Sequence, residues 1–308
     1  MAPLTRFTRM TAPSGQQFEV GQNGYRAVVT ESGGALRLLE RDGVALIDGF
    51  AEDAVSPGGR GQLLMPWTNR IRDGRYTVDG KDLQLPLTEP ARGNASHGFA
   101  RWAAWSLVDL TDEAVELGLR VMAQSGYPWL LDLSVRYALD EDGLTVEQSA
   151  VNRSTTPAPY ACGAHPYLSA GPGPIDSWEL STSVDQRLLV DDRLLPVSEE
   201  ATVGSAYDFR EPRMIGSTRF DDAFRVAGVA QVTLQDPSSG RRVELWGDES
   251  VRWLQLFSAD EVPGTSRRSL AVEPMTAPAD AFNSGTDLLW LVPGERHTMR
   301  WGVRASGQ

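Results

Sequence analysis

The chain has 308 residues, of which 41 are acidic and 29 are basic, and its formal net charge is −12. This charge repels nucleic-acid phosphates and anionic lipid, so neither nucleic acid nor a membrane is expected as a partner. No segment approaches the ~20 apolar residues that a membrane helix needs, and residues 1–10 contain no apolar run of signal-peptide length.

Thirty glycines and nineteen prolines interrupt the chain so often that long helices are not expected. Apolar residues instead recur at every second position, which is typical of strands with one packed face. Asp-Gly pairs at residues 42–43, 73–74, 79–80 and 142–143 supply the positive φ of tight hairpin turns. Strands are predicted at residues 18–20, 25–30, 35–40, 114–121, 131–137, 144–151, 188–190, 224–226, 231–234, 242–246, 253–257 and 298–303.

These short strands predict an all-β fold, a large antiparallel β-sandwich with few short helices. No repeat, low-complexity tract or linker divides the sequence, so a single domain is expected over residues 1–308. Residues 170–212 are rich in proline, glycine and charge, and we interpret them as a long excursion at the rim of the sandwich.

The first candidate site lies in residues 60–76, where an apolar strand leads into a loop with Trp67, Asn69 and Arg70. This trio suits a sugar, because the aromatic ring can cover a C–H face while the amide and guanidinium donate to hydroxyls. Arg72 and Arg75 are interpreted as a solvated turn. A phosphate or sulfonate site is the alternative, since guanidinium groups fit tetrahedral anions.

His97 precedes Gly98 among aromatic residues. It can hold a substrate oxygen if Gly98 leaves the approach uncrowded, and a structural histidine is the alternative. His297 lies in a charged turn near the end of the sequence and is interpreted as a surface residue.

His165 occupies the segment 163–168, where Pro166 favours extended geometry and should fix the angle at which the imidazole leaves a strand end. An unperturbed pKa of ~6.5 lets histidine exchange a proton near neutrality. Cys162 is the single cysteine, so no intrachain disulfide forms and a reducing compartment, the cytoplasm, is expected. A small buried thiol is favoured over a nucleophile for Cys162.

Two acidic segments complete the candidate set. Asp221 and Asp222 stand between aromatic residues, and in a strand only one of them can face a given site, with solvated rim acids as the alternative. Glu273 is predicted to end an apolar strand and is followed by Pro274, which makes it a candidate general base whose pKa burial would raise. Asp280 and Asn283 are interpreted as ties for the next turn.

Other chemistries have less support. No Gly-x-Gly-x-x-Gly or Gly-Lys-Ser/Thr loop offers a nucleotide site, and no cysteine pair offers a zinc site. A metal centre of His97, His165 and Glu273 is disfavoured because no closely spaced histidine pair lies on one element. No metal or other cofactor is therefore expected.

The order of these segments resembles the aldose 1-epimerase (mutarotase) family over nearly the whole chain. The resemblance rests on residues 69–71, 73–76, 97–98, 165–167, 220–224, 253–257, 273–274 and 280–283. It implies a galactose mutarotase type of β-sandwich that acts on free hexoses without a cofactor. It further implies Glu273 as the base, His165 as the acid, and His97, Arg70, Asp221 and Gln255 as substrate contacts. Asp221 is preferred to Asp222 because it directly follows the aromatic residue.

Residues 66–70 and the Asp-Gly after Arg72 look more like a bacterial branch that includes mutarotases of modified sugars such as sulfoquinovose. The principal hypothesis is interconversion of the anomers of a free aldose by a monomer or homodimer. A mutarotase of an anionic sugar and a non-catalytic carbohydrate-binding protein are the alternatives. We expect Glu273 and His165 to meet across one cavity, about a pyranose width apart.

Overall fold

The computed structural model describes residues 12–262, 264 and 266–306. Strands make up 49% of it and helices 4%, which confirms the predicted all-β class. None of the described helices is long and apolar enough to span a membrane. The expectation for residues 1–10 concerns a segment that lies outside the described residues.

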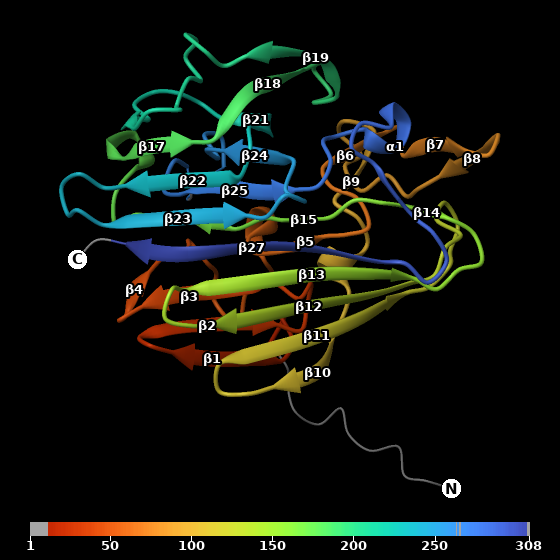
Figure 1. The fold of residues 1–308 in the computed structure, drawn as a ribbon, viewed down its shortest axis with the longest axis horizontal. Helices are drawn as coiled ribbons and strands as arrows, with labels where there is room; N and C mark the ends of the chain where they lie inside the picture. Colours follow the sequence, from red (N-terminus) through yellow and green to blue (C-terminus); the bar gives the residue numbers. More distant parts are fainter. Residues whose placement is uncertain (1–11, 263, 265, 307–308) are drawn as a thin grey trace, which may run out of the picture.

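Two large antiparallel sheets form the sandwich (Figure 1). The nine-stranded sheet has the order β10 (Ser106–Leu110), β11 (Ala114–Val121), β12 (Leu131–Leu139), β13 (Leu144–Asn152), β27 (Arg296–Ser306), β23 (Arg242–Gly247), β22 (Ala230–Gln235), β17 (Glu179–Thr182) and β20 (Arg213–Met214). The eight-stranded sheet has the order β19 (Pro196–Ala201), β18 (Val184–Val190), β21 (Asp221–Val226), β24 (Trp253–Phe257), β25 (Leu270–Met275), β15 (Gly163–Ala164) and β5 (Leu63–Leu64), and β16 (Tyr167–Leu168) also pairs with β25.

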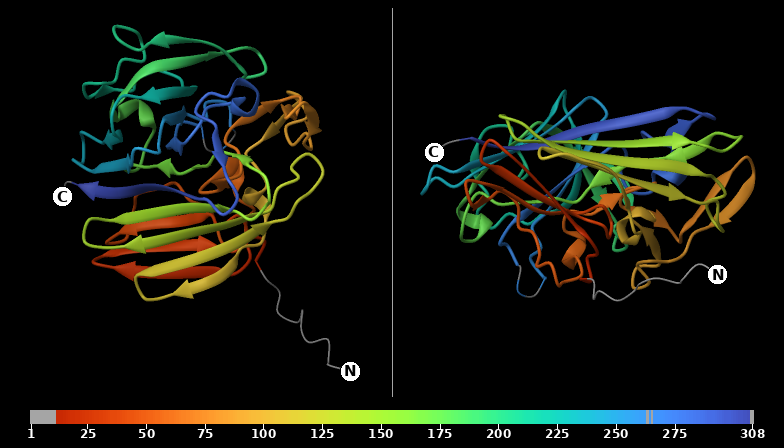
Figure 2. Two further views of the ribbon diagram at one scale, coloured as in Figure 1. Left: turned by 45° about the vertical axis from the view of Figure 1, so that its right-hand side comes forward. Right: turned by 90° about the horizontal axis from the view of Figure 1, so that it is seen from below.

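Smaller elements extend these sheets. The N-terminal strands form a four-stranded sheet whose β1 and β2 contact β11 and β12, and Figure 2 shows it as a layer beside them. Its strands are β1 (Gln17–Gln22), β2 (Tyr25–Thr30), β3 (Leu36–Arg41) and β4 (Val44–Ala45). Three strand pairs are β6 (Arg70–Arg72) with β9 (Asn94–Ser96), β7 (Arg75–Val78) with β8 (Lys81–Gln84), and β14 (Ala158–Tyr160) with β26 (Leu289–Leu291). The helical elements are η1 (Pro57–Gly59), η2 (Ala100–Trp102), η3 (Ile175–Ser177) and α1 (Ala281–Ser284).

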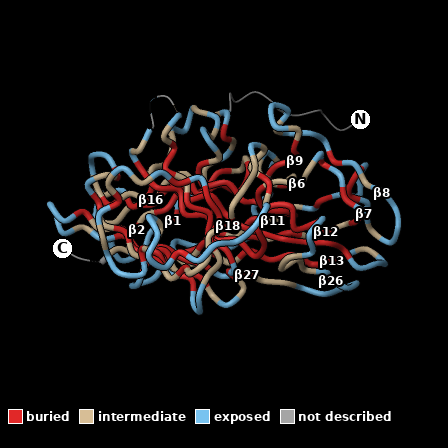
Figure 3. The backbone as a smooth tube through the Cα atoms, turned by 90° about the horizontal axis from the view of Figure 1, so that it is seen from above, coloured by how far each residue is buried: buried red, intermediate tan, exposed pale blue. Residues whose placement is uncertain are grey.

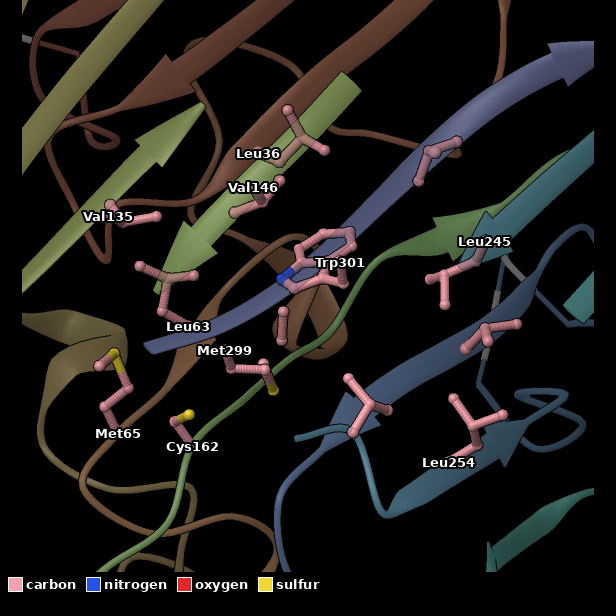
Figure 4. Packing of buried hydrophobic residues seen from close by; sticks show 14 of the residues in the cluster. Leu36, Leu63, Met65, Val135, Val146, Cys162, Leu245, Leu254, Met299 and Trp301 are labelled. Carbon is pink, nitrogen blue, oxygen red and sulfur yellow. The ribbon is translucent and has the colours of Figure 1, made fainter. Parts of the chain in front are cut away.

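The core lies between the two large sheets. Buried backbone runs through the middle of the molecule in Figure 3, with exposed loops around it. Figure 4 shows the packing, in which Met299 and Trp301 of β27 share one apolar cluster with Leu245 of β23 and Leu254 of β24. Because side chains alternate along a strand, the residues between these core positions point to the other face of each sheet.

The interpretation of residues 170–212 as a long excursion at the rim is wrong, whereas the strand predicted at 188–190 within this range is part of β18 (Val184–Val190). Residues 170–212 contribute β17 to the nine-stranded sheet and both β18 and β19 to the eight-stranded sheet. Leu180 and Thr182 of β17 are buried, and Trp178 just before the strand is fully enclosed in the core. The four-residue strand is too short for its alternation to stand out among the surrounding proline, glycine and charge.

Strand β25 carries Glu273, the candidate general base. Leu270 and Val272 belong to the main core cluster, so Glu273 points to the opposite face of the sheet. The prediction that the strand ends at Glu273 is wrong, because β25 continues through Pro274 to Met275. Pro274 is tolerated there because it lies opposite the break between β15 and β16, where the neighbouring ladder is interrupted.

Candidate active site

A cavity of about 590 Å³ opens on the face of the eight-stranded sheet that is turned away from the core. Strands β21, β24 and β25 form its floor, since Asp221, Gln255 and Glu273 line it. Arg70 of β6 and His97, which follows β9, stand on one wall beside His165. Side chains that are far apart in the sequence therefore converge on one volume of a size typical for small-molecule sites.

Glu273 and His165 are in direct contact, with 3.2 Å between Oε1 and Nε2. Both side chains are nearly buried, and each lines the cavity. The expectation that they share one cavity is met, but the expected spacing of a pyranose width is wrong. Opening of a sugar ring requires proton transfer at two oxygens, O1 and the ring oxygen. Both are bonded to C1, so an acid and a base that act on them need to be neighbours.

The imidazole of His165 is held from both sides. The ring of Tyr167 stacks on it at 5.1 Å with an interplanar angle of 10°, and the Arg60 guanidinium lies 4.2 Å from the centre of the Tyr167 ring. On another side the backbone of Gly59 is so close that a Cβ there would lie 3.0 Å from His165 Cδ2. Arg60 is fixed in turn by an ion pair of 3.0 Å with Asp48. The orientation of the imidazole is thus set by packing.

Burial shifts both members of the pair toward their neutral forms. The pKa of His165 is lowered to about 3, chiefly by burial and further by the charges of Arg101 and Arg60. The pKa of Glu273 is raised well above its ordinary value by burial and by the nearby Asp221, against the opposing charges of Arg70 and Arg101. These shifts favour a neutral imidazole and a protonated carboxyl, so the pair holds one proton.

A chain of hydrogen bonds crosses the cavity floor. Arg70 binds both oxygens of Glu89, at 2.8 and 3.1 Å, and donates to Asn69 Oδ1 at 3.0 Å. Asn69 donates to Gln255 Oε1 at 3.2 Å, and Gln255 donates to Asp221 Oδ1 at 3.1 Å. Each side chain in this chain of hydrogen bonds is oriented by the next one. Together they present a fixed set of donors and acceptors to hydroxyl groups of a ligand.

His97 stands next to this chain. Its backbone N–H donates to Asn69 O at 2.8 Å, and its ring centre lies 5.9 Å from that of His165. Burial, together with the charges of His165, Arg101 and Arg70, lowers the pKa of His97 well below its ordinary value. Its Nδ1 is buried and has no hydrogen-bond partner among the described residues, and the residue lines the cavity.

The interpretation of Gly98 as a residue that clears the approach to His97 is wrong. A Cβ at Gly98 would lie 2.0 Å from Met65 O, and the backbone has a φ of +71°. Glycine is therefore needed for the close packing of two backbone segments.

The two neighbouring aspartates of β21 both border the cavity, but their side chains have different partners, Gln255 for Asp221 and Arg187 for Asp222. Asp221 faces the cavity, and burial by the surrounding walls raises its pKa, with Arg70 opposing this shift. Asp222 is buried and pairs with Arg187 at 2.7 Å. Asp221 is thus the one placed to meet a ligand on the floor of the cavity.

Trp67 does not line the cavity, contrary to the expectation that it covers a sugar face. Its side chain is only 2% exposed, and its ring packs in the core at 4.8 Å from Phe99 and 6.2 Å from Phe282. The tryptophan supports the wall that carries Asn69 and Arg70 from behind.

Five other predicted residues are structural. Arg72 pairs with Asp280 at 3.3 Å, which ties β6 to the segment before α1. Asn283 donates to the same carboxylate at 2.7 Å, consistent with the predicted tie. Burial raises the pKa of Cys162 to about 12, which agrees with an inert thiol. His297 lies within β27 and is half-buried, so the surface interpretation is wrong.

Three residues of the site were missed. Arg60, Glu89 and Gln62 orient or line the wall that carries Arg70, His97 and His165, and none of them stands in a recognisable motif. The only signal was the position of Arg60 just before the segment that leads to Arg70. Within the described part of the chain, no group of three or more His, Cys, Asp or Glu side chains is arranged to hold a metal ion.

Comparisons with known proteins show the family and the fold of the chain. The sequence profile of the family described as Aldose 1-epimerase matches residues 16–304. A protein of Escherichia coli (strain K12) named Uncharacterized protein YihR is 31% identical over 303 residues, which covers 98% of this chain and 96% of the relative. The galactose mutarotase of Homo sapiens is 27% identical over 293 residues, or 86% of this chain and 84% of the relative. The structure of a GalM/aldose epimerase homologue from C. elegans has the same fold, with a TM-score of 0.84, 18% identity, and coverage of 95% of this chain and 99% of that one.

Proposed function

The chain belongs to the aldose 1-epimerase family, and we propose that it interconverts the α and β anomers of a free aldose by acid–base opening and closing of the sugar ring. The observation that carries this proposal is the contact between Glu273 and His165 at the wall of the cavity. Galactose mutarotases among the relatives support a monosaccharide as the ligand.

In the proposed reaction Glu273 takes the proton of the O1 hydroxyl while His165 gives a proton to the ring oxygen. The bond between C1 and the ring oxygen breaks as the C1–O1 double bond forms. The aldehyde group then rotates about the C1–C2 bond, and closure on the other face of C1 reverses both proton transfers. Each proton transfer contributes about 10²- to 10⁴-fold.

The protonation state of the empty site is compatible with these roles. The reaction needs one proton on the pair, and the pKa shifts of both groups indicate that the pair holds one. Transfer of this proton from Glu273 to His165 across their 3.2 Å contact gives a carboxylate base and an imidazolium acid. No net uptake of a proton is required, and such a pair titrates as a unit.

The surrounding groups are proposed to bind the sugar hydroxyls. Asp221 and Gln255 offer acceptors from the floor, while Arg70, Asn69 and His97 stand on the wall. Since Arg70 and Asn69 are already oriented by neighbours, little ordering is needed when a sugar binds.

Polarimetry of freshly dissolved α-glucose and α-galactose tests the proposal. Glu273→Gln and His165→Asn should each abolish the enzyme-dependent equilibration, while Glu261→Gln, an exposed carboxylate on the cavity rim, serves as the matched control. Unfolding midpoints of all variants check that the fold is retained. Wild-type rates in both of the first two variants would refute the assigned roles. Sugar binding by the wild type without any acceleration would identify a carbohydrate-binding protein instead.

A further inference from the structure

A side hollow of about 270 Å³ adjoins the cavity on the wall that carries the catalytic histidine. The two spaces share Arg70, His97 and His165, so a ligand held in one is in contact with the other. Trp102, which is half exposed, marks the side on which the hollow meets solvent. The mechanism proposed above leaves this hollow unused.

Among the arginines that line the cavity and the hollow, Arg101 is the one without an ion-pair partner in the described part of the chain. Arg70 and Arg92 both pair with Glu89, and Arg219 pairs with Asp260. Within residues 12–262, 264 and 266–306, no carboxylate lies within ion-pair distance of Arg101, and its buried Nε has no hydrogen-bond partner.

The position of Arg101 is fixed although its charge is unpaired. Its guanidinium carbon lies 5.1 Å from the centre of the Trp102 ring, and its backbone carbonyl accepts a hydrogen bond from Gln62 at 2.8 Å. Burial lowers the pKa of Arg101, and the more distant Glu273 and Glu89 only partly offset this effect. A half-buried cation without a partner is costly, and an anionic ligand would remove this cost.

Two buried polar atoms of residues that line the hollow also lack a partner. Gln62 Oε1 and His97 Nδ1 have no hydrogen-bond partner among the described residues. The carboxylate of Glu89 also lines the hollow, but its oxygens already accept hydrogen bonds from Arg70 and Arg92. Two guanidinium groups and one engaged carboxylate leave the hollow with an excess of positive charge.

The bonds of the sugar ring indicate which substituent of the sugar lies toward the hollow. His165 is assigned to the ring oxygen, which is bonded to C5, and C5 carries the exocyclic C6. An atom on C6 therefore lies close to the oxygen that His165 serves, on the wall that the hollow shares with the cavity.

We infer that the hollow is a subsite for an anionic group on C6 of the aldose, with Arg101 as the residue that binds the charge. This inference rests on the proposed mutarotase function and names its substrate class. A carboxylate, a phosphate or a sulfonate on C6 shares the required chemistry, because each presents two oxygens to one guanidinium.

Magnetisation-transfer NMR of anomer exchange at equilibrium tests the inference. The sugars are glucose, glucuronate, glucose 6-phosphate and 6-deoxy-6-sulfoglucose, which place no charge, a carboxylate, a phosphate and a sulfonate on C6. The wild type should have a higher kcat/KM for at least one of the three anions than for glucose, and the preferred anion identifies the group. Arg101→Met should lower the ratio of kcat/KM for this anion to that for glucose by about 10- to 100-fold.

Two further variants sharpen the test. Arg101→Lys keeps the charge without the planar guanidinium and should retain part of the preference. Arg219→Met removes a positive charge from the opposite, exposed rim of the cavity and should leave the ratio unchanged. Should Arg101→Met fail to fold, Arg101→Lys and competition of each anion against glucose in the wild type decide the question.

The outcomes separate the inference from the proposed function. Two results would overturn the subsite alone. One is acceleration of anomer exchange in glucose with no preference for any anion, and the other is an Arg101→Met variant whose ratio of kcat/KM for the anion to that for glucose equals the wild-type ratio. Failure to accelerate any of the four sugars, and galactose as well, would overturn the mutarotase proposal and the subsite with it.

Discussion

Glu273 Oε1 lies 3.2 Å from His165 Nε2, so the carboxyl and the imidazole form one hydrogen-bonded pair. The two residues come from neighbouring chain segments of the same sheet, since Glu273 lies on β25 and His165 lies between β15 and β16, which both pair with β25. Both groups are nearly buried, and burial shifts each pKa toward the neutral form. The pair therefore behaves as a single site that holds one proton.

The first prediction concerns pH. The rate should follow a broad bell, because the pair works only with one proton. The pKa of His165 is lowered to about 3, so a second proton binds only in acid, and the acid limb lies below the range of an ordinary histidine. The pKa of Glu273 is raised, so the pair keeps its proton as the pH rises past the ordinary carboxyl range, and its loss gives the alkaline limb. The measurement is kcat/KM from acid to alkaline pH. An acid limb at ~6.5, the ordinary pKa of histidine, would contradict the prediction.

The second prediction concerns the ring that supports the catalytic histidine. Tyr167→Leu removes the ring stacked on His165 and should lower kcat by about 3- to 10-fold, the equivalent of about 0.5–1.5 kcal/mol for an aromatic pair. Water admitted beside the imidazole should also move the acid limb of the pH profile upward. Tyr167→Phe is the matched control, since it keeps the ring and loses only the hydroxyl bond of 2.8 Å to Gly58 O. Equal kinetics and equal pH profiles in both variants would show that stacking does not position the imidazole.

Strand alternation made most of the fold predictable. The buried residues of β12 recur at every second position, and this pattern correctly predicts a packed face. Asp221 and Asp222 have different partners, Gln255 and Arg187, as alternation along one strand predicts, but both residues border the cavity. These inferences depend only on neighbours in sequence, which is why the sequence suffices for them.

Partners that are distant in sequence could not be predicted in the same way. Trp67 stands two residues from Asn69, yet it is enclosed by Phe99 and Phe282, and only the tertiary packing decides between core and cavity. Arg70, Arg72 and Arg101 look alike in sequence, but carboxylates contributed by other loops neutralise the first two. The free charge of Arg101 becomes visible only when those pairs are known.

The third prediction separates the two aspartates. Asp221→Asn should reduce kcat/KM by about 10- to 100-fold through loss of charge-assisted hydrogen bonds to the sugar, with the unfolding midpoint nearly unchanged. Asp222→Asn weakens a buried ion pair with Arg187 and should cost about 1–3 kcal/mol of unfolding free energy while activity is retained. Thermal or denaturant unfolding and anomerisation rates, measured on both variants, check the pair of outcomes. Reversed effects would mean that β21 presents its other face to the ligand.

The fourth prediction concerns the backbone contact behind His97. Gly98→Ala should destabilise the protein by about 3 kcal/mol or more, because the new Cβ would lie 2.0 Å from Met65 O in a backbone with a φ of +71°. Relief of this clash must move the segment that carries His97, so the anomerisation rate should fall together with the unfolding midpoint. Gly80→Ala is the matched control, because Gly80 has a φ of +73° but no atom within 4 Å of the added Cβ, so only the left-handed strain of about 1–2 kcal/mol remains. Equal loss of stability in the two variants would show that strain, and not the contact with Met65, explains the glycine beside His97.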